Sequence, residues 1–114
     1  MEKTIFQKIV DKEIPAKILF EDEHCFAIQD IRAQAPHHFL VIPRKVITKL
    51  SEASFEDKAL LGHLMLVCAQ LAKKEGIADE GFRVVINNGE HAGQTVFHLH
   101  LHVLGGRPLS WPPG

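Results

Sequence analysis

Residues 98–104 read His-Leu-His-Leu-His-Val-Leu, so imidazole side chains alternate with apolar ones. Side chains on a strand point alternately to its two faces, so the alternation predicts a strand over residues 97–104, ended by Gly105-Gly106. The apolar face suits burial under helices and carries Leu99, Leu101 and Val103. The opposite face carries the imidazoles of His98, His100 and His102.

Four other short stretches, each bounded by turn residues, predict strands at residues 18–20, 25–29, 38–42 and 82–87. The first three are joined by turns too short for crossover helices, so they should be antiparallel. Thr4 and Gln7 have the spacing of a capping box and predict a short helix that ends near Asp11. A longer helix is predicted between a cap at Ser54 and a stop at Gly76.

The buried stripe of the longer helix is expected to consist of Leu60, Leu61, Leu64, Cys68, Leu71 and Ala72. Together these elements predict one α+β domain over residues 1–114, with a five-stranded antiparallel sheet and two helices.

Composition excludes several classes of protein. The chain has 114 residues and a formal charge of -1, which argues against a basic nucleic-acid domain or a polybasic membrane binder. Its longest wholly apolar run, residues 64–69, is far short of the roughly 20 residues of a membrane span. Two cysteines, Cys25 and Cys68, without zinc-finger spacing predict reduced thiols. We expect a soluble, cytoplasmic domain that binds neither nucleic acid nor membrane.

Three imidazoles on one strand face indicate chemistry, because burial without partners disfavours them and they repel one another when charged. The spacing leaves two hypotheses open: a metal site, or nucleophilic and acid–base catalysis at phosphorus. The preceding loop favours the second. Gly89, Gly93, Gln94 and Thr95 offer backbone N–H groups, an amide and a hydroxyl, which suit phosphate oxygens.

The pattern His-φ-His-φ-His-φ-φ, where φ is apolar, resembles the signature of the histidine triad (HIT) superfamily and is met in full. The whole chain is similar to the HINT branch, the purine nucleoside phosphoramidases. The flanking segments that carry the resemblance are Ile5-Phe6, residues 12–17, Phe20-Glu21-Asp22, Ala35-Pro36, residues 38–43, residues 61–64 and the final Trp-Pro-Pro-Gly.

The resemblance implies a homodimer whose two sheets join into one of ten strands. It implies that His100 is the nucleophile and forms a nucleotidyl-histidine intermediate that water hydrolyses. His98 and His102 would contact phosphate and handle protons. His38 would hydrogen-bond the far nitrogen of the nucleophile and orient it. The other histidines are expected at the surface and are His24, His37, His63 and His91.

The resemblance also implies a set of nucleotide contacts. The base would lie among the apolar side chains of Ile5, Phe6, Ile9, Ile28, Ile31 and Leu40. Asp30 would bind the ribose hydroxyls. The phosphate side would be lined by Asn87, Gly93, Gln94, Thr95 and Val96. Trp111 would approach the site of the partner subunit, and neither a metal nor a cofactor is expected.

The function that follows is hydrolysis of the P–N bond of purine nucleoside 5′-phosphoramidates, and of aminoacyl adenylates, with release of AMP or GMP. Two alternatives stay open. One is a nucleotide-binding regulatory module in which catalysis is incidental. The other is a zinc-binding protein that uses the three histidines as ligands.

Overall fold

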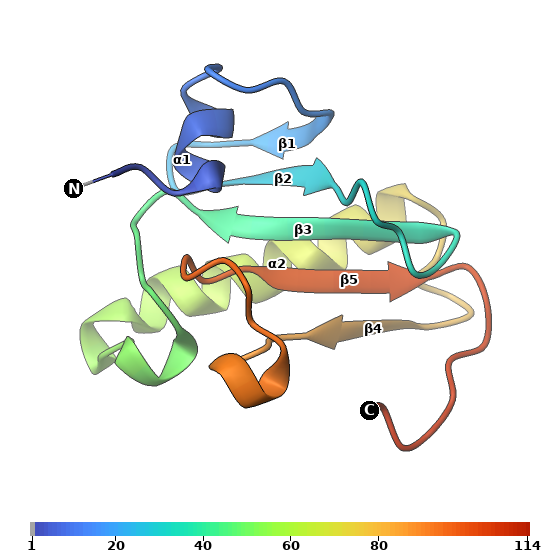
Figure 1. Cartoon of the computed structure of the whole chain (residues 1–114). Coiled ribbons are helices and arrows are strands. Elements are labelled where there is room, and N and C mark those ends of the chain that lie inside the picture. The colour runs from blue at the N-terminus through green and yellow to red at the C-terminus, as the bar shows by residue number, and fades with distance from the viewer. Residues whose placement is uncertain (1) are drawn as a thin grey trace.

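A computed structural model describes residues 2–114 of the chain. Five strands form one antiparallel sheet in the order β1-β2-β3-β5-β4 (Figure 1). Their bounds are β1 Ile18–Glu21, β2 Cys25–Gln29, β3 His37–Pro43, β4 Phe82–Val85 and β5 Leu101–Gly105. Two α-helices accompany the sheet, α1 Ile5–Val10 and α2 Lys58–Lys74. The predicted class and the predicted set of strands and helices are therefore confirmed.

Both helices begin where the sequence placed caps. The backbone N–H of Gln7 donates to Thr4 Oγ1 over 3.2 Å, and the Gln7 side chain accepts from the Thr4 N–H over 2.8 Å. This capping box starts α1. Ser54 caps a turn of 3-10 helix, Phe55–Asp57, from which α2 continues. The α2 helix ends before Gly76, whose φ of +79° favours glycine.

The two faces of the sheet bury separate apolar clusters. Figure 1 shows α2 behind the sheet and α1 in front of it, near the β1–β2 edge. On the α2 face the larger cluster includes Cys25, Ala27, Phe39, Val41, Leu64, Cys68, Leu71, Leu101 and Val103. On the α1 face the smaller cluster consists of Phe6, Ile9, Phe26, Ile28, Leu40 and Ile42. Alternate residues of β2 and β3 thus serve two different cores.

The last strand is shorter than predicted. Pairing of β5 with β3 extends only to the pair Val41–Leu101, and the Leu99 N–H donates instead to the Ile47 carbonyl over 2.6 Å. The β3 strand ends at Pro43, which has no N–H to continue the ladder. Residues 98–100 therefore lie just outside the strand.

The alternation of side chains nevertheless continues through this segment. The apolar members are 0–1% exposed and belong to the α2-face cluster: Leu99, Leu101 and Val103. Among the described residues, no helix combines the length and apolar character that crossing a membrane requires.

Candidate active site

His100 lies immediately before β5, and a backbone carbonyl determines its tautomer. Its Nδ1 lies 2.8 Å from the carbonyl oxygen of His98. A carbonyl only accepts hydrogen bonds, so Nδ1 carries the proton and donates it. The Nε2 lone pair of His100 is therefore free, and the imidazole is prepared to act as a nucleophile.

A chain of hydrogen bonds sets the tautomers of two more histidines. The backbone N–H of Gln34 donates to His38 Nδ1 over 3.0 Å, so the proton of a neutral His38 is on Nε2. That Nε2 lies 3.0 Å from His102 Nδ1 and 3.3 Å from Asp30 Oδ2. His102 Nδ1 consequently accepts, and the proton of His102 is on its own Nε2. The site thus combines a lone pair on His100 with an N–H on His102.

The expected contact between His38 and His100 is not present in this structure. His38 is paired with His102, and the far nitrogen of His100 is held by the His98 carbonyl. The reason is geometric, since His38 and Leu104 are partners in the β3–β5 register and His102 is the next side chain on the same face. His38 therefore orients His102.

His98 is also placed differently from the expectation. Its side chain is fully buried, and both ring nitrogens are engaged. Nε2 donates to the Pro43 carbonyl over 2.8 Å, so Nδ1 accepts from the Thr4 hydroxyl over 2.7 Å. No nitrogen of His98 remains for a phosphate. These hydrogen bonds hold in place the residue whose carbonyl accepts from His100.

Sequence reasoning missed Thr4 as a part of the site. The hydroxyl accepts from Gln7 and donates to His98, so one side chain both caps α1 and locks the first histidine of the motif. The two residues are 94 positions apart. Only the capping box was visible in the sequence, and it gave no indication of the contact with His98.

Burial keeps the histidines of the site neutral. Burial lowers the pKa of His98, and the hydrogen bond to the Pro43 carbonyl partly offsets this decrease. Burial likewise lowers the pKa of His100, and the hydrogen bond to the His98 carbonyl partly offsets it. Burial also lowers the pKa of His38, against the attraction of the Asp30 carboxylate. Burial, reinforced by charge repulsion from His100 and His38, lowers the pKa of His102 to about 4. The tautomers above are thus those of neutral rings.

A cavity of about 480 Å³ opens onto His100 and His102. Nine of the twelve predicted nucleotide contacts line it: Ile5, Phe6, Ile9, Ile28, Asp30, Ile31, Leu40, Thr95 and Val96. Sequence reasoning did not select the other lining residues, which include Ile14, Pro15, Ala16, Gln29 and Arg32. One wall is therefore apolar, and the histidines and Asp30 form the polar part.

Three predicted phosphate contacts do not line this cavity: Asn87, Gly93 and Gln94. Gln94 is buried and its side chain is saturated by backbone groups. Its amide donates to the carbonyls of Thr48 and Val96 over 2.8 and 3.2 Å, and its oxygen accepts from the Gly89 N–H over 2.8 Å. Gln94 thus shapes the loop that presents Thr95 and Val96, rather than offering its amide to a ligand.

The remaining predicted residues lie outside the cavity. The side chain of Trp111 is 80% exposed. The guanidinium carbon of Arg83, Cζ, lies over the Trp111 ring, 6.0 Å from the ring centroid. Of the histidines expected at the surface, His24 and His91 are exposed. His37 and His63 are only partly exposed, and each faces a carboxylate, Glu75 at 3.5 Å and Asp22 at 2.7 Å respectively.

Comparison with known proteins identifies the family. The family model for the HIT domain matches residues 11–109. This chain belongs to the HIT family. It is 45% identical over 109 residues to the purine nucleoside phosphoramidase of Escherichia coli, a match that covers 96% of this chain and 92% of that protein. An uncharacterised HIT-like protein of Synechocystis is 59% identical over 113 residues, covering 99% and 98% of the two chains.

Solved structures support the same assignment for this HIT protein. A HIT family hydrolase from Legionella pneumophila superposes with a TM-score of 0.96 at 44% identity, and 98% of this chain and 100% of that chain are covered. A HIT family hydrolase from Clostridium thermocellum gives a TM-score of 0.93 at 40% identity, covering 96% of each chain. The class of enzyme supported by these relatives is a HIT family hydrolase.

Proposed function

We propose that this HIT protein hydrolyses the P–N bond of purine nucleoside 5′-phosphoramidates through a covalent intermediate on His100. The observation that carries the proposal is the pair of opposite tautomers. His100 offers a lone pair because its other nitrogen donates to a carbonyl, and His102 offers an N–H because its other nitrogen accepts from His38. A nucleophile beside a hydrogen-bond donor to the leaving group suits displacement at phosphorus.

The cavity suits a nucleoside monophosphate in three respects. Its apolar wall, with Phe6, Ile9 and Ile28, offers the flat surface that a purine base needs. Asp30 keeps Oδ1 on the Arg32 N–H and has Oδ2 near His38, and its free lone pairs suit ribose hydroxyls. Thr95 lines the cavity and has a hydroxyl for a phosphate oxygen.

The proposed reaction has two displacements. In the first, the Nε2 lone pair of His100 forms a bond to phosphorus while the P–N bond breaks; the Nε2–H of His102 hydrogen-bonds to the departing nitrogen, which takes its proton from a water molecule and leaves hydroxide in solution. The His100 Nδ1–H stays on the His98 carbonyl, which stabilises the positive charge that the ring acquires. In the second, water attacks phosphorus, the P–Nε2 bond breaks, and the proton released by water neutralises the hydroxide formed in the first step. The products are the nucleoside monophosphate and the free amine.

The same chemistry extends to aminoacyl adenylates, whose leaving group is a carboxylate and needs no proton. The two classes of substrate therefore separate the roles of His100 and His102. Replacing His100 should abolish turnover of both. Replacing His102 should impair the phosphoramidate far more than the adenylate, since the poorer leaving group, the amine, depends more on the hydrogen bond from the His102 Nε2–H.

The test is steady-state hydrolysis of adenosine 5′-phosphoramidate by the full chain and by His100→Ala, with and without EDTA. We expect the wild type to turn over, the variant to lose at least about 1000-fold in kcat/KM, and the chelator to have no effect. His91→Ala, an exposed histidine outside the cavity, is the matched control. Turnover by His100→Ala at the wild-type rate would contradict the proposal.

A second candidate function has one observation in its favour. Asp30, His38 and His102 each offer an atom within 4.8 Å of the others, a geometry that a metal ion can use. Loss of activity on treatment with EDTA, restored by zinc, would favour this metal-dependent hydrolase. High nucleotide affinity with negligible turnover on all phosphoramidates would instead favour a nucleotide-binding regulatory module.

We also propose a homodimer in which the two sheets continue through their β4 edges. β4 is the terminal strand of the sheet. Three apolar side chains are exposed: Met65 to 49%, Leu66 to 66% and Phe97 to 45%. A second subunit would cover them. Light scattering should give twice the chain mass for the wild type and a monomer for Leu66→Glu. Phe55→Glu, at another exposed apolar side chain, is the control and should stay dimeric.

In such a dimer the C-terminal tail of one subunit would approach the cavity of the other, as predicted for Trp111. Trp111→Ala should then raise KM for substrates with bulky leaving groups and leave folding unchanged. The two free, buried thiols Cys25 and Cys68 suit the reducing cytoplasm in which we place this activity.

A further inference from the structure

A second cluster of potential ligands lies on the α2 face of the sheet, away from the cavity described above. It consists of Asp22, in the turn after β1, Cys25, the first residue of β2, and His63, in α2. One carboxylate oxygen, the thiol sulfur and one ring nitrogen all lie within 4.8 Å of one another. Cys25 belongs to the α2-face core, whereas the substrate cavity adjoins the α1-face core.

The carboxylate of Asp22 is held rigidly toward His63. Its Oδ1 accepts from the backbone N–H groups of His24 and Cys25, both over 2.8 Å. Its Oδ2 lies 2.7 Å from His63 Nε2. Burial raises the pKa of Asp22, but these hydrogen bonds and the nearby His63 outweigh it and lower the pKa to about 2. The ligand oxygen is therefore ionised and already oriented, and a metal ion can take the place of the proton between Oδ2 and Nε2.

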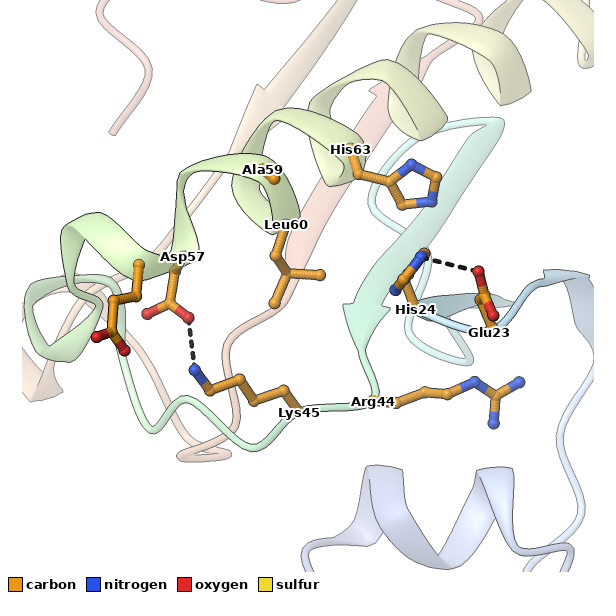
Figure 2. A pocket seen from close by; sticks show the side chains of 9 residues that line it. Glu23, His24, Arg44, Lys45, Asp57, Ala59, Leu60 and His63 are labelled. Atoms are coloured by element: carbon orange, nitrogen blue, oxygen red, sulfur yellow. Dashed lines mark hydrogen bonds and ion pairs between the residues drawn. The ribbon is translucent and has the colours of Figure 1, made fainter.

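His24 lies beside His63 and carries a further imidazole. Its ring centroid lies 5.4 Å from that of His63, in an edge-to-face arrangement. Its own side chain is 56% exposed and is held only by Glu23 at 3.2 Å. Figure 2 shows the two imidazoles across from one another, His63 on α2 and His24 on the turn that leads into β2. Both rings line an open cavity of about 540 Å³, so an ion can reach His63 from the solvent.

From this juxtaposition we infer a zinc site formed by Asp22, Cys25 and His63, completed by His24. Thiolate, imidazole and carboxylate ligands together match the preferences of Zn²⁺ rather than those of Mg²⁺ or Ca²⁺. Four protein ligands leave no open position, so the ion is structural. It ties the β1–β2 turn to α2 and takes no part in the reaction at His100.

Binding at this site must release a proton from the thiol. Burial, together with the negative charge of Asp22, raises the pKa of Cys25 to about 12, so the apo protein carries a neutral thiol there. Metal coordination removes that proton, and the thiolate then serves as the ligand.

The experiment uses the full chain stripped of metal, in a His38→Ala/His102→Ala background that removes the other metal-capable group among the described residues. Zinc is titrated against a chromogenic chelator. We expect one Zn²⁺ per chain, and a loss of at least about 100-fold in affinity in His63→Ala, because a direct ligand is removed. His91→Ala is the control and should bind as tightly as the background protein.

Cobalt provides a reading that is independent of affinity. Co²⁺ bound by a thiolate gives a near-ultraviolet charge-transfer band, which we expect in the background protein and not after Cys25→Ser. Cys68→Ser, at the other buried free cysteine, is the matched control and should keep the band. If Cys25→Ser fails to fold, His63→Ala is read in the same cobalt spectrum and should lose the band at one equivalent of Co²⁺, because the ion no longer binds beside the thiol. Absence of stoichiometric zinc, or a site that survives His63→Ala unchanged, would overturn the inference.

Discussion

Residues 98–103 serve two faces of the sheet, and the two faces are stabilised in different ways. Toward α2, the side chains of Leu99, Leu101 and Val103 are 0–1% exposed and pack in the larger apolar cluster. Toward α1, His100 and His102 line a cavity and make directed hydrogen bonds. Stability should therefore depend mainly on the first face and chemistry on the second.

The polar face is organised mostly by the backbone. The carbonyls of Pro43 and His98 accept from His98 and His100, and the Gln34 N–H donates to His38. Backbone groups neither titrate nor change rotamer, so they hold each imidazole in one tautomer. The candidate active site can accordingly keep several histidines neutral at close range, although among residues 2–114 only one carboxylate, that of Asp30, lies beside them.

The largest expected effect is on activity, from His102→Ala. Removing the N–H that hydrogen-bonds to the leaving nitrogen should lower kcat for a phosphoramidate by about 1000-fold. The free energy of unfolding should change by less than about 1 kcal/mol, because His38 Nε2 keeps Asp30 as a partner. Steady-state kinetics and urea denaturation on the same preparation measure both. A loss of activity that merely follows a loss of stability would break the division between the faces.

The converse change is Leu101→Ala on the apolar face. We expect a loss of about 3 kcal/mol in the free energy of unfolding, from lost burial and the cavity left behind. Ile31→Ala is the matched control, since Ile31 lines the substrate cavity and is 95% exposed. It should leave stability within about 0.5 kcal/mol and raise KM. Equal destabilisation by the two substitutions would contradict the comparison.

The alternation in residues 98–104 was enough to predict which side chains share a face, because strand geometry has a period of two. Capping chemistry is equally local, and it placed the start of α1 at Thr4 and the end of α2 before Gly76. The resemblance to the HINT branch added the cavity wall, of which Ile5, Phe6 and Ile9 are examples. These features depend on residues close in sequence or on a motif.

What sequence reasoning missed depends on contacts between distant segments. The burial of His98 follows from its bonds to Thr4 and Pro43, 94 and 55 positions away. The pairing of His38 with His102 follows from the β3–β5 register, and β5 starts at Leu101 because the Leu99 N–H is taken by Ile47. No local pattern determines such partners, so the hydrogen-bond contacts of His98, His38 and Gln94 could not be predicted from the sequence.

The next effect concerns pH. Burial lowers the pKa of His102 from an ordinary 6.5 to about 4, so between these values the unfolded chain binds more protons than the folded one. Stability should therefore fall as the pH drops below about 6.5, by at most about 3 kcal/mol from this group at pH 4. Urea denaturation at a series of pH values measures it. His102→Ala should show a shallower decline, and an unchanged slope would argue against a neutral, buried His102.

The smallest effect should come from Thr4, which acts only through His98. Thr4→Val removes the hydroxyl and should lower kcat about tenfold with KM nearly unchanged, because His100 loses orientation rather than substrate contacts. Thr4→Ser keeps the hydroxyl and should restore kcat. The pH profile adds a second readout, since a displaced His98 carbonyl alters the acidic limb set by His100. If Thr4→Val and Thr4→Ser lowered kcat equally, Thr4 would act through the packing of α1 and not through its hydroxyl.

The central claim is that His100 attacks phosphorus and water follows, and the stereochemical course at phosphorus tests it most directly. The substrate is an adenosine 5′-phosphoramidate made chiral at phosphorus by sulfur, hydrolysed by the full chain in water labelled with a heavy oxygen isotope. Two successive in-line displacements predict retention of configuration. Inversion would mean that water attacks the substrate directly, and it would contradict the account.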